Sequence, residues 1–327
     1  MDFELRDAKV GDIDACMKLL TSKYMADPEH PDAIGTMWSE ILRSKSGLFF
    51  VAADPALANR IVHFGVCVFV SDPCADEYHR AARPLIARRI VREWAQGARP
   101  FLAAGEIARA NAGGGLNLVI SHYGSIRVNE EVTERVRVAN YESMRRALLG
   151  WNLRSYTTEA FGRENPELNP DHWGLSLGYR VRKYAREQLV EAGISEPEAP
   201  SLWTATRADA VRNPGYAMAV LFNSFTRPRF GFTGAEQETL RLAMDGRTDD
   251  AIARETGISL ASIKKRFRAI YEKALHVEPH AEALRASAAE GKRGAESRRR
   301  LLLYLREHPE ELRPYSPFET RKLKRDR

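Results

Sequence analysis

Cysteine, histidine motifs and long apolar runs are all scarce in this sequence. The three cysteines, Cys16, Cys67 and Cys74, form an odd, sparse set without metal-ligand spacing, as expected in a reducing compartment. The eight histidines show neither an HxH nor an HExxH pattern, so no zinc site is expected. No apolar run approaches the roughly 18 residues of a membrane span. The acidic, mixed start MDFELRDAKVGD is unlike a signal peptide. We therefore expect a cytoplasmic protein.

What the sequence does have is length and an uneven distribution of charge. Its 327 residues suffice for about two domains, each able to bury a core. The net charge is +6, and the segments 259–275, 291–300 and 321–327 each carry an excess of four positive charges, so the rest of the chain is net acidic. A cationic end beside an acidic body is typical of a protein that binds DNA, although solubility tails look similar.

The stretch 232–275 predicts three short helices with a tight turn before the last one. Thr233 and Glu236 have the spacing of a capping box at the start of the first helix. Gly257 is placed to make the turn, because glycine adopts a left-handed conformation without strain. The last helix carries apolar residues at helical spacing, which predicts a buried stripe: Ile263, Phe267, Ile270 and Ala274.

The opposite face of the last helix is cationic. A helix with one apolar and one cationic face, presented by a preceding helix and a glycine turn, suits the major groove of DNA. An ordinary amphipathic helix with a solvated charged face is the alternative interpretation. We predict that the DNA-contacting residues are Thr248, Ser259, Ala261, Ser262, Lys264, Lys265, Arg266, Arg268 and Lys273.

This stretch resembles the C-terminal helix-turn-helix domain of LuxR-type transcription regulators. The likeness rests on three groups of residues: Phe232, Thr233, Glu236, Glu238 and Leu240 at the start, Gly246, Thr248, Ile252 and Ala253 in the middle, and Ile258, Ser259, Ser262, Ile263, Lys264, Ile270 and Lys273 at the end. Ala235 stands where the family usually has arginine, and Arg266 replaces its frequent histidine. The resemblance implies a DNA-binding module that reads two half-sites as a dimer.

The N-terminal part predicts a mixed α/β domain that resembles the GNAT acyltransferase fold. The predicted order is strand–helix–helix–strand–strand, then strand–helix–strand–helix–strand. The residues that carry the likeness are Leu5-Arg6-Asp7-Ala8, Asp12-Ile13 and Leu177-Gly178-Tyr179-Arg180. The resemblance implies an Arg/Gln-x-x-Gly-x-Gly/Ala loop that holds the acetyl-CoA pyrophosphate at a helix N-terminus.

The sequence does not place such a loop where the resemblance needs it. Arg109 lies four residues before Gly113, and the three glycines lead into a predicted strand rather than a helix. They could cradle a phosphate with bare N–H groups, or they could simply serve a loop that needs positive φ. We expect no catalytic, cofactor-binding or metal-binding residues, with acetyl-CoA disfavoured, and we expect Gly114→Val to disturb the loop without abolishing any cofactor affinity.

The sequence thus predicts an α+β protein. It divides into a GNAT-like domain over 1–190, a linker and junction over 191–229, a LuxR-type helix-turn-helix domain over 230–310 and a basic tail over 311–327. The expected function is transcription regulation by a homodimer bound to double-stranded DNA. Its N-terminal domain would sense a small-molecule or protein signal or oligomerise, without enzymatic activity. The alternative is an acyl-CoA-dependent N-acyltransferase fused to a DNA-binding module, and a structural DNA binder is a third reading.

Overall fold

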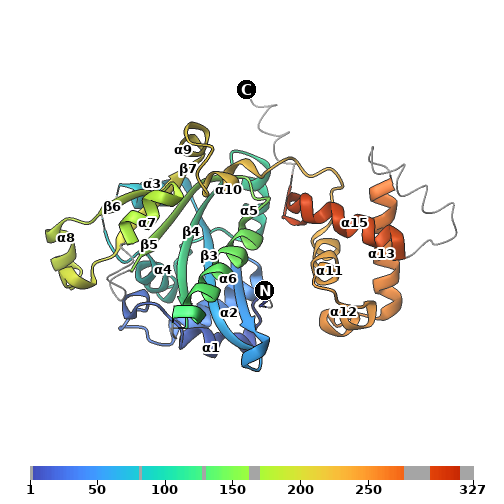
Figure 1. Cartoon of the computed structure of the whole chain (residues 1–327), viewed down its shortest axis with the longest axis horizontal. Coiled ribbons are helices and arrows are strands. Elements are labelled where there is room, and N and C mark those ends of the chain that lie inside the picture. The colour runs from blue at the N-terminus through green and yellow to red at the C-terminus, as the bar shows by residue number, and fades with distance from the viewer. Residues whose placement is uncertain (1–2, 81–82, 127–129, 162–169, 276–294, 317–327) are drawn as a thin grey trace. The chain divides into compact units, whose positions relative to one another are not determined.

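The computed structural model describes residues 3–80, 83–126, 130–161, 170–275 and 295–316, and it divides into two compact units, Met1–Ser224 and Phe225–Arg327. The first unit is built on a seven-stranded sheet with the strand order β1-β2-β3-β4-β5-β7-β6 (Figure 1). Neighbouring strands are antiparallel except for β4 and β5, which are parallel. The strands are β1 (Glu4–Asp7), β2 (Gly47–Asp54), β3 (Arg60–Val70), β4 (Leu116–Ser125), β5 (Leu153–Ala160), β6 (Arg180–Lys183) and β7 (Ser201–Thr206).

Helices cover both faces of this sheet because successive strand residues point to opposite sides. On β3, Val66 and Val68 join one core, whereas Cys67 and Phe69 join the other. The first core is shared with α1 (Ile13–Met17), α2 (Ala33–Ser44), α3 (Asp72–His79), α4 (Ile86–Ala95) and α8 (Arg186–Glu191). The second core is shared with α5 (Ala104–Ala112), α6 (Glu130–Leu148), α7 (Pro170–Leu177), α9 (Arg207–Arg212) and α10 (Ala219–Asn223).

The centre of the first core is aromatic. Trp38 of α2 is fully buried, and its ring lies 5.2 Å from that of Phe49 and 5.4 Å from that of Phe64. Aromatic pairs at these separations add to the free energy of burial. Ile34 and Ile41 lie on the same inner face of α2 as Trp38, and this face packs α2 against the sheet, α1 and α4.

The second unit contains only helices among its described residues. They are α11 (Gly234–Met244), α12 (Asp249–Thr256), α13 (Leu260–Leu275), α15 (Ala295–Glu307) and the short 3-10 helix η5 (Pro309–Leu312). The predicted stripe on α13 is confirmed, because Ile263, Phe267, Ile270 and Ala274 are all buried in the core of this unit. Leu301 and Leu305 of α15 complete that core.

Two expected domain boundaries are wrong. The segment 191–229 is not a linker, because it contains β7, which pairs with β5 on one side and β6 on the other, and the first unit ends at Ser224. Its acidic, proline-rich start suggested a linker, but those residues form a turn that leads into the sheet. The tail does not begin at 311 either: Glu311 accepts hydrogen bonds from the backbone of Arg229 and Phe230. The expected basic end, 321–327, lies outside the described residues.

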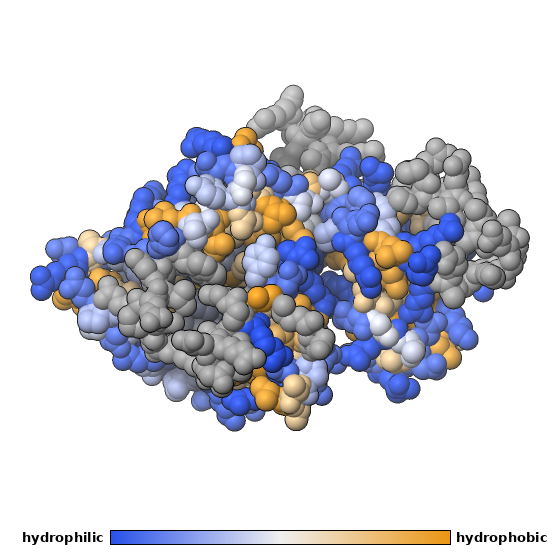
Figure 2. All heavy atoms as spheres, viewed as in Figure 1, coloured by the Kyte–Doolittle hydropathy of each residue, from blue (hydrophilic) through white to orange (hydrophobic). Residues whose placement is uncertain are grey.

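In the part of the chain that the structure describes, no helix is long and apolar enough to cross a membrane. Hydrophilic residues cover much of the face seen in Figure 2, with smaller apolar areas between them.

Candidate functional site

β4 and β5 run side by side over their first halves and then diverge. Their last paired residues are Ile120 and Thr158, although β4 continues to Ser125 and β5 to Ala160. Each strand keeps its outer neighbour to the end, β3 for β4 and β7 for β5. The β3–β4 register shifts at Ser121, and a bulge of this kind bends a strand. We call the residues beyond these last pairs the β4–β5 divergence; they are 121–125 of β4 and 159–160 of β5.

Another segment of the chain pairs with the edge of β4 that β5 leaves free. Leu20 forms an isolated antiparallel bridge with Gly124, and the backbone N–H of Thr21 donates to the carbonyl of Tyr123 over 3.1 Å. This approach requires glycine at 124, because a Cβ there would collide with the carbonyl oxygen of Leu19. The segment after α1 therefore covers the freed edge of β4.

The backbone of β5 in the divergence is also occupied. The Tyr123 hydroxyl donates to the carbonyl of Glu159 over 3.0 Å and accepts from the N–H of Phe161 over 3.1 Å. Burial raises the pKa of the Tyr123 hydroxyl, so it stays protonated and keeps its donor role. Tyr123 thus bridges the two strands after their own pairing has ended.

Glu159 places a buried carboxyl at the end of β5. Only 4% of the residue is exposed. The carboxyl accepts from the N–H groups of Leu85 and Ile86 over 2.8 and 2.7 Å, and from the Tyr184 hydroxyl over 2.7 Å. Burial raises the pKa of Glu159 to about 7, and these hydrogen bonds oppose that rise. The carboxyl therefore caps the start of α4 and is also able to take up or release a proton near neutral pH.

The nearby histidines are poor proton acceptors. His122 of β4 is fully buried against Trp38, and burial lowers its pKa to about 3. His63 of β3 lies 2.9 Å from the Ser125 hydroxyl, and burial lowers its pKa to about 4. Both rings are neutral at physiological pH, so Glu159 is the group at the divergence whose proton is exchangeable there.

The sequence after β4 lacks the glycines expected of an acetyl-CoA pyrophosphate loop. Between β4 and α6 it reads IRVN, without glycine, and α6 begins with the sequence Glu130-Glu131. A pyrophosphate at a helix N-terminus needs several converging N–H groups and no competing negative charge. Within the described residues, the freed edge of β4 is covered as well, by the segment after α1.

The glycine run before β4 meets a requirement of backbone conformation and packing. As expected, Gly113–Gly115 lead into a strand. Gly115 has φ +102°, and a Cβ there would lie 2.9 Å from the carbonyl oxygen of Asn152, whereas nothing lies within 4 Å of a Cβ on Gly114. The expectation that Gly114 needs positive φ is therefore wrong, and the requirement falls on Gly115.

One cluster in the described residues has the donor atoms of a metal site. Asp27, Glu29 and His30 lie close enough to share an ion. Arg92 already contacts this cluster: its Nη2 donates to Asp27 over 2.9 Å and to Glu29 over 3.1 Å. The guanidinium therefore supplies the positive charge that an ion would otherwise bring.

The helical unit has the predicted helix caps and the glycine turn before α13. Thr248 caps α12 by accepting from the N–H of Ala251, Gly257 ends that helix with φ +69°, and the Ser259 hydroxyl accepts from the N–H of Ser262 at the start of α13. Thr248 and Ser259 are thus structural caps. Five of the predicted contacts on α13 are exposed: Ala261, Ser262, Lys264, Lys265 and Arg268.

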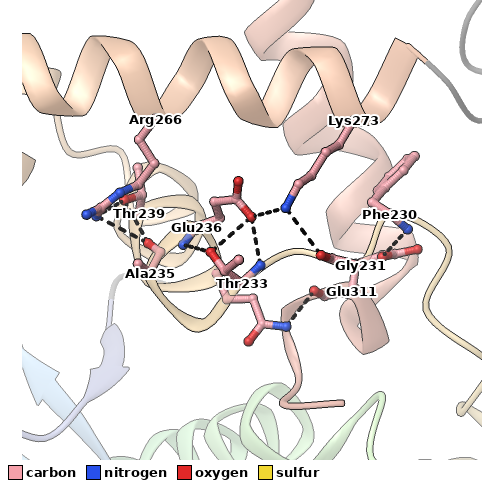
Figure 3. Close-up of polar contacts among 10 residues, drawn as sticks. Phe230, Gly231, Thr233, Ala235, Glu236, Thr239, Arg266, Lys273 and Glu311 are labelled. Atoms are coloured by element: carbon pink, nitrogen blue, oxygen red, sulfur yellow. Dashed lines mark hydrogen bonds and ion pairs between the residues drawn. The ribbon is translucent and has the colours of Figure 1, made fainter. Parts of the chain in front are cut away.

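Two of the predicted DNA contacts point into the unit instead (Figure 3). Lys273 forms an ion pair with Glu236 over 2.6 Å. Arg266 donates to the Thr239 hydroxyl over 2.9 Å and to the carbonyl of Ala235 over 3.3 Å. Both residues fasten α13 to α11, which leaves Lys264, Lys265 and Arg268 as the cationic group of the outer face.

Several solved structures of acetyltransferases are similar to part of this chain. Three of its structural neighbours are an acetyltransferase related to a histone acetyltransferase from Corynebacterium glutamicum (12% identity, TM-score 0.32, 62% of this chain and 95% of that one), a ribosomal-protein-S5-alanine acetyltransferase from Vibrio fischeri (11%, 0.32, 63% and 93%) and a polyamine N-acetyltransferase from Drosophila melanogaster (14%, 0.32, 63% and 100%). At these identities the likeness concerns the fold alone. No protein-family model and no curated protein matches the sequence.

These neighbours correct one expectation. The prediction that the chain is not an enzyme is contradicted, since several structures similar to it are acetyltransferases. The LuxR-type assignment of the helical unit stays a prediction, since no family model matches.

Sequence reasoning missed Glu159, Tyr123 and Tyr184. They are separated in the chain and carry no motif, so only the fold brings them together. The sequence does indicate a cationic helix face, because the spacing of the arginines in α4 places several of them on one side of the helix.

Proposed function

We propose that this chain is an acyl-transfer enzyme joined to a DNA-binding unit. The observation that carries the proposal is the exchangeable proton of Glu159 at the β4–β5 divergence. An amine that accepts an acyl group must lose a proton, and a carboxyl with a pKa of about 7 is suited to receive it. Tyr184, which donates to the same carboxyl, orients it.

The acyl donor class in this proposal is a thioester. Because Tyr123 bridges the two strands and the segment around Leu20 covers the edge of β4, the donor requires that Tyr123 release the β5 backbone and that this segment leave the edge. The sequence before α6 has no glycine and α6 begins with two glutamates, so we expect the nucleotide end of coenzyme A to contribute little there.

The proposal is tested by measuring thiol release from acetyl-CoA and from acetyl-pantetheine with primary amines as acceptors. We expect acceptor-dependent release whose rate rises with pH through about 7, as Glu159 loses its proton. Glu159→Gln should remove this pH dependence and reduce the rate by about 10²-fold or more. A rate unchanged in Glu159→Gln across the pH range would contradict the proton-acceptor role.

We further propose that the helical unit binds double-stranded DNA, in the manner of LuxR-type modules and as a homodimer. Support comes from Lys264, Lys265 and Arg268, which are exposed on one face of α13 behind a capped turn. Their spacing places three cations on adjacent turns, where they can reach phosphates or base edges. Light scattering on a duplex with two half-sites should show two protomers, and one protomer per duplex would contradict the dimer.

A further inference from the structure

A cavity of about 380 Å³ lies in the first unit between α4 and α8. Its wall is rich in arginine: Arg83 precedes α4, and Arg88, Arg89 and Arg92 follow along the helix. Residues three and four apart lie on the same helix face, so these side chains converge on one side of the cavity. The volume falls in the range of sites for small molecules.

Two of these arginines already have carboxylate partners. Arg92 pairs with Asp27 and Glu29, and Arg89 pairs with Glu77. Their charges are largely balanced within the protein, so they contribute shape and hydrogen-bond donors more than net charge.

The other two arginines differ. Arg88 donates through Nε to the carbonyl of Ala26 over 2.9 Å, and its guanidinium lies 5.4 Å from the ring centroid of Tyr24. Within the described ranges, neither Arg88 nor the exposed Arg83 forms an ion pair with a carboxylate. Burial lowers the pKa of Arg88, and the carboxylates of Asp27 and Glu29 oppose this only in part, so the charge carries a desolvation cost. A bound anion would offset that cost.

The corner between these two arginines is strained. Leu85, which lines the cavity, has φ +66°, a left-handed conformation that is unfavourable for leucine. The Glu159 carboxylate stabilises it by accepting the Leu85 N–H. Strain of this kind is often found where a chain is shaped to hold a ligand.

We propose that this cavity binds a phosphate-bearing small molecule, with its phosphate held by Arg83 and Arg88. The planar guanidinium matches the spacing of phosphate oxygens and binds them through paired hydrogen bonds. Glu93 and Glu191 also line the cavity, so the phosphate is one end of the ligand and the rest is not anionic. This site goes beyond acyl transfer and does not depend on it.

The test is calorimetric titration of the full chain at low salt with inorganic phosphate and with ADP. We expect binding of both probes, weakened about tenfold or more in Arg88→Gln, because a charge-assisted hydrogen bond is lost. The matched control is Arg43→Gln, an exposed arginine of α2 outside the cavity, which should bind as wild type does.

Two further variants make the result decisive. Lys264→Ala/Lys265→Ala removes cations of the helical unit, so probe bound there is lost in this variant while the binding that Arg83→Gln and Arg88→Gln weaken remains. Arg83→Gln changes an exposed side chain and should weaken binding even if Arg88→Gln fails to fold. Absence of binding at millimolar probe, or equal affinity in wild type and Arg83→Gln, would overturn the site.

Discussion

At the scale of single residues, this protein uses polar and small side chains where its strands separate. Tyr123 replaces a missing strand partner with its hydroxyl, and Gly124 allows a second segment to approach. Neither role is visible in the sequence, since a tyrosine and a glycine at a strand end have many ordinary uses. The sequence predicts a residue with positive φ in the glycine run before β4. It places this residue at Gly114, whereas the structure places it at Gly115.

Glu159 gives a pH dependence with a definite sign. Its pKa is raised from 4.5 to about 7 in the folded chain, so the folded state binds its proton more tightly than the unfolded one. The resulting stabilisation is complete below pH 4.5 and is lost as pH rises through 7. At about 1.4 kcal/mol per unit, the loss is on the order of 3 kcal/mol.

As the pH rises from 4.5 through 7, we therefore expect the free energy of unfolding of wild type to fall by about 3 kcal/mol relative to that of Glu159→Gln. The comparison removes the opposite effect of His63 and His122, which both proteins share. Parallel denaturant-unfolding curves for the two proteins across this pH range would contradict the raised pKa.

Gly124→Ala should destabilise the first unit by about 1–3 kcal/mol, because the added methyl group overlaps the carbonyl oxygen of Leu19. Gly114→Ala is the control, since nothing lies within 4 Å of the added Cβ and φ is not positive. Thermal unfolding measures both, and equal stability of the two variants would contradict the close approach of the segment after α1.

At the scale of elements, local sequence patterns predict the helices of 232–275 and the strands β1 to β6, but not β7. The three helices of 232–275 follow from caps and apolar spacing, both of which are local. β7 was missed because its alternating sequence follows an acidic, proline-rich segment, and its two strand partners are distant in sequence. The inward attachment of Arg266 and Lys273 also depends on contacts with α11, which the helix pattern alone does not show.

The residues of α13 should separate into two groups. Lys264→Ala/Lys265→Ala should weaken DNA binding and reduce the salt dependence by about 0.9 per lost phosphate contact, without changing stability. Lys273→Ala should lower stability by roughly 1–2 kcal/mol, since it leaves Glu236 buried without its cation. Salt-dependent fluorescence anisotropy and thermal unfolding measure the two effects. A Lys264→Ala/Lys265→Ala protein that binds as tightly as wild type would contradict the interface.

At the scale of the whole molecule, the chain consists of two units, of which the first ends at Ser224 and the second begins at Phe225. We expect the fragment 1–224 to fold cooperatively, whereas 1–190 should not, because it lacks β7 and leaves β5 and β6 without the strand that joins them. Denaturant unfolding of both fragments measures this. A cooperative transition in 1–190 with the stability of 1–224 would place the boundary where the sequence first suggested it.

The central claim is acyl transfer at the β4–β5 divergence, and the most direct measurement compares wild type with Tyr123→Phe. The variant lacks the hydroxyl that bridges to Glu159 and Phe161, so the donor should enter more readily. We predict acceptor-dependent thiol release from acetyl-pantetheine in both proteins, with a faster rate in Tyr123→Phe. Thiol release no faster than without protein, in wild type and variant alike, would contradict the account.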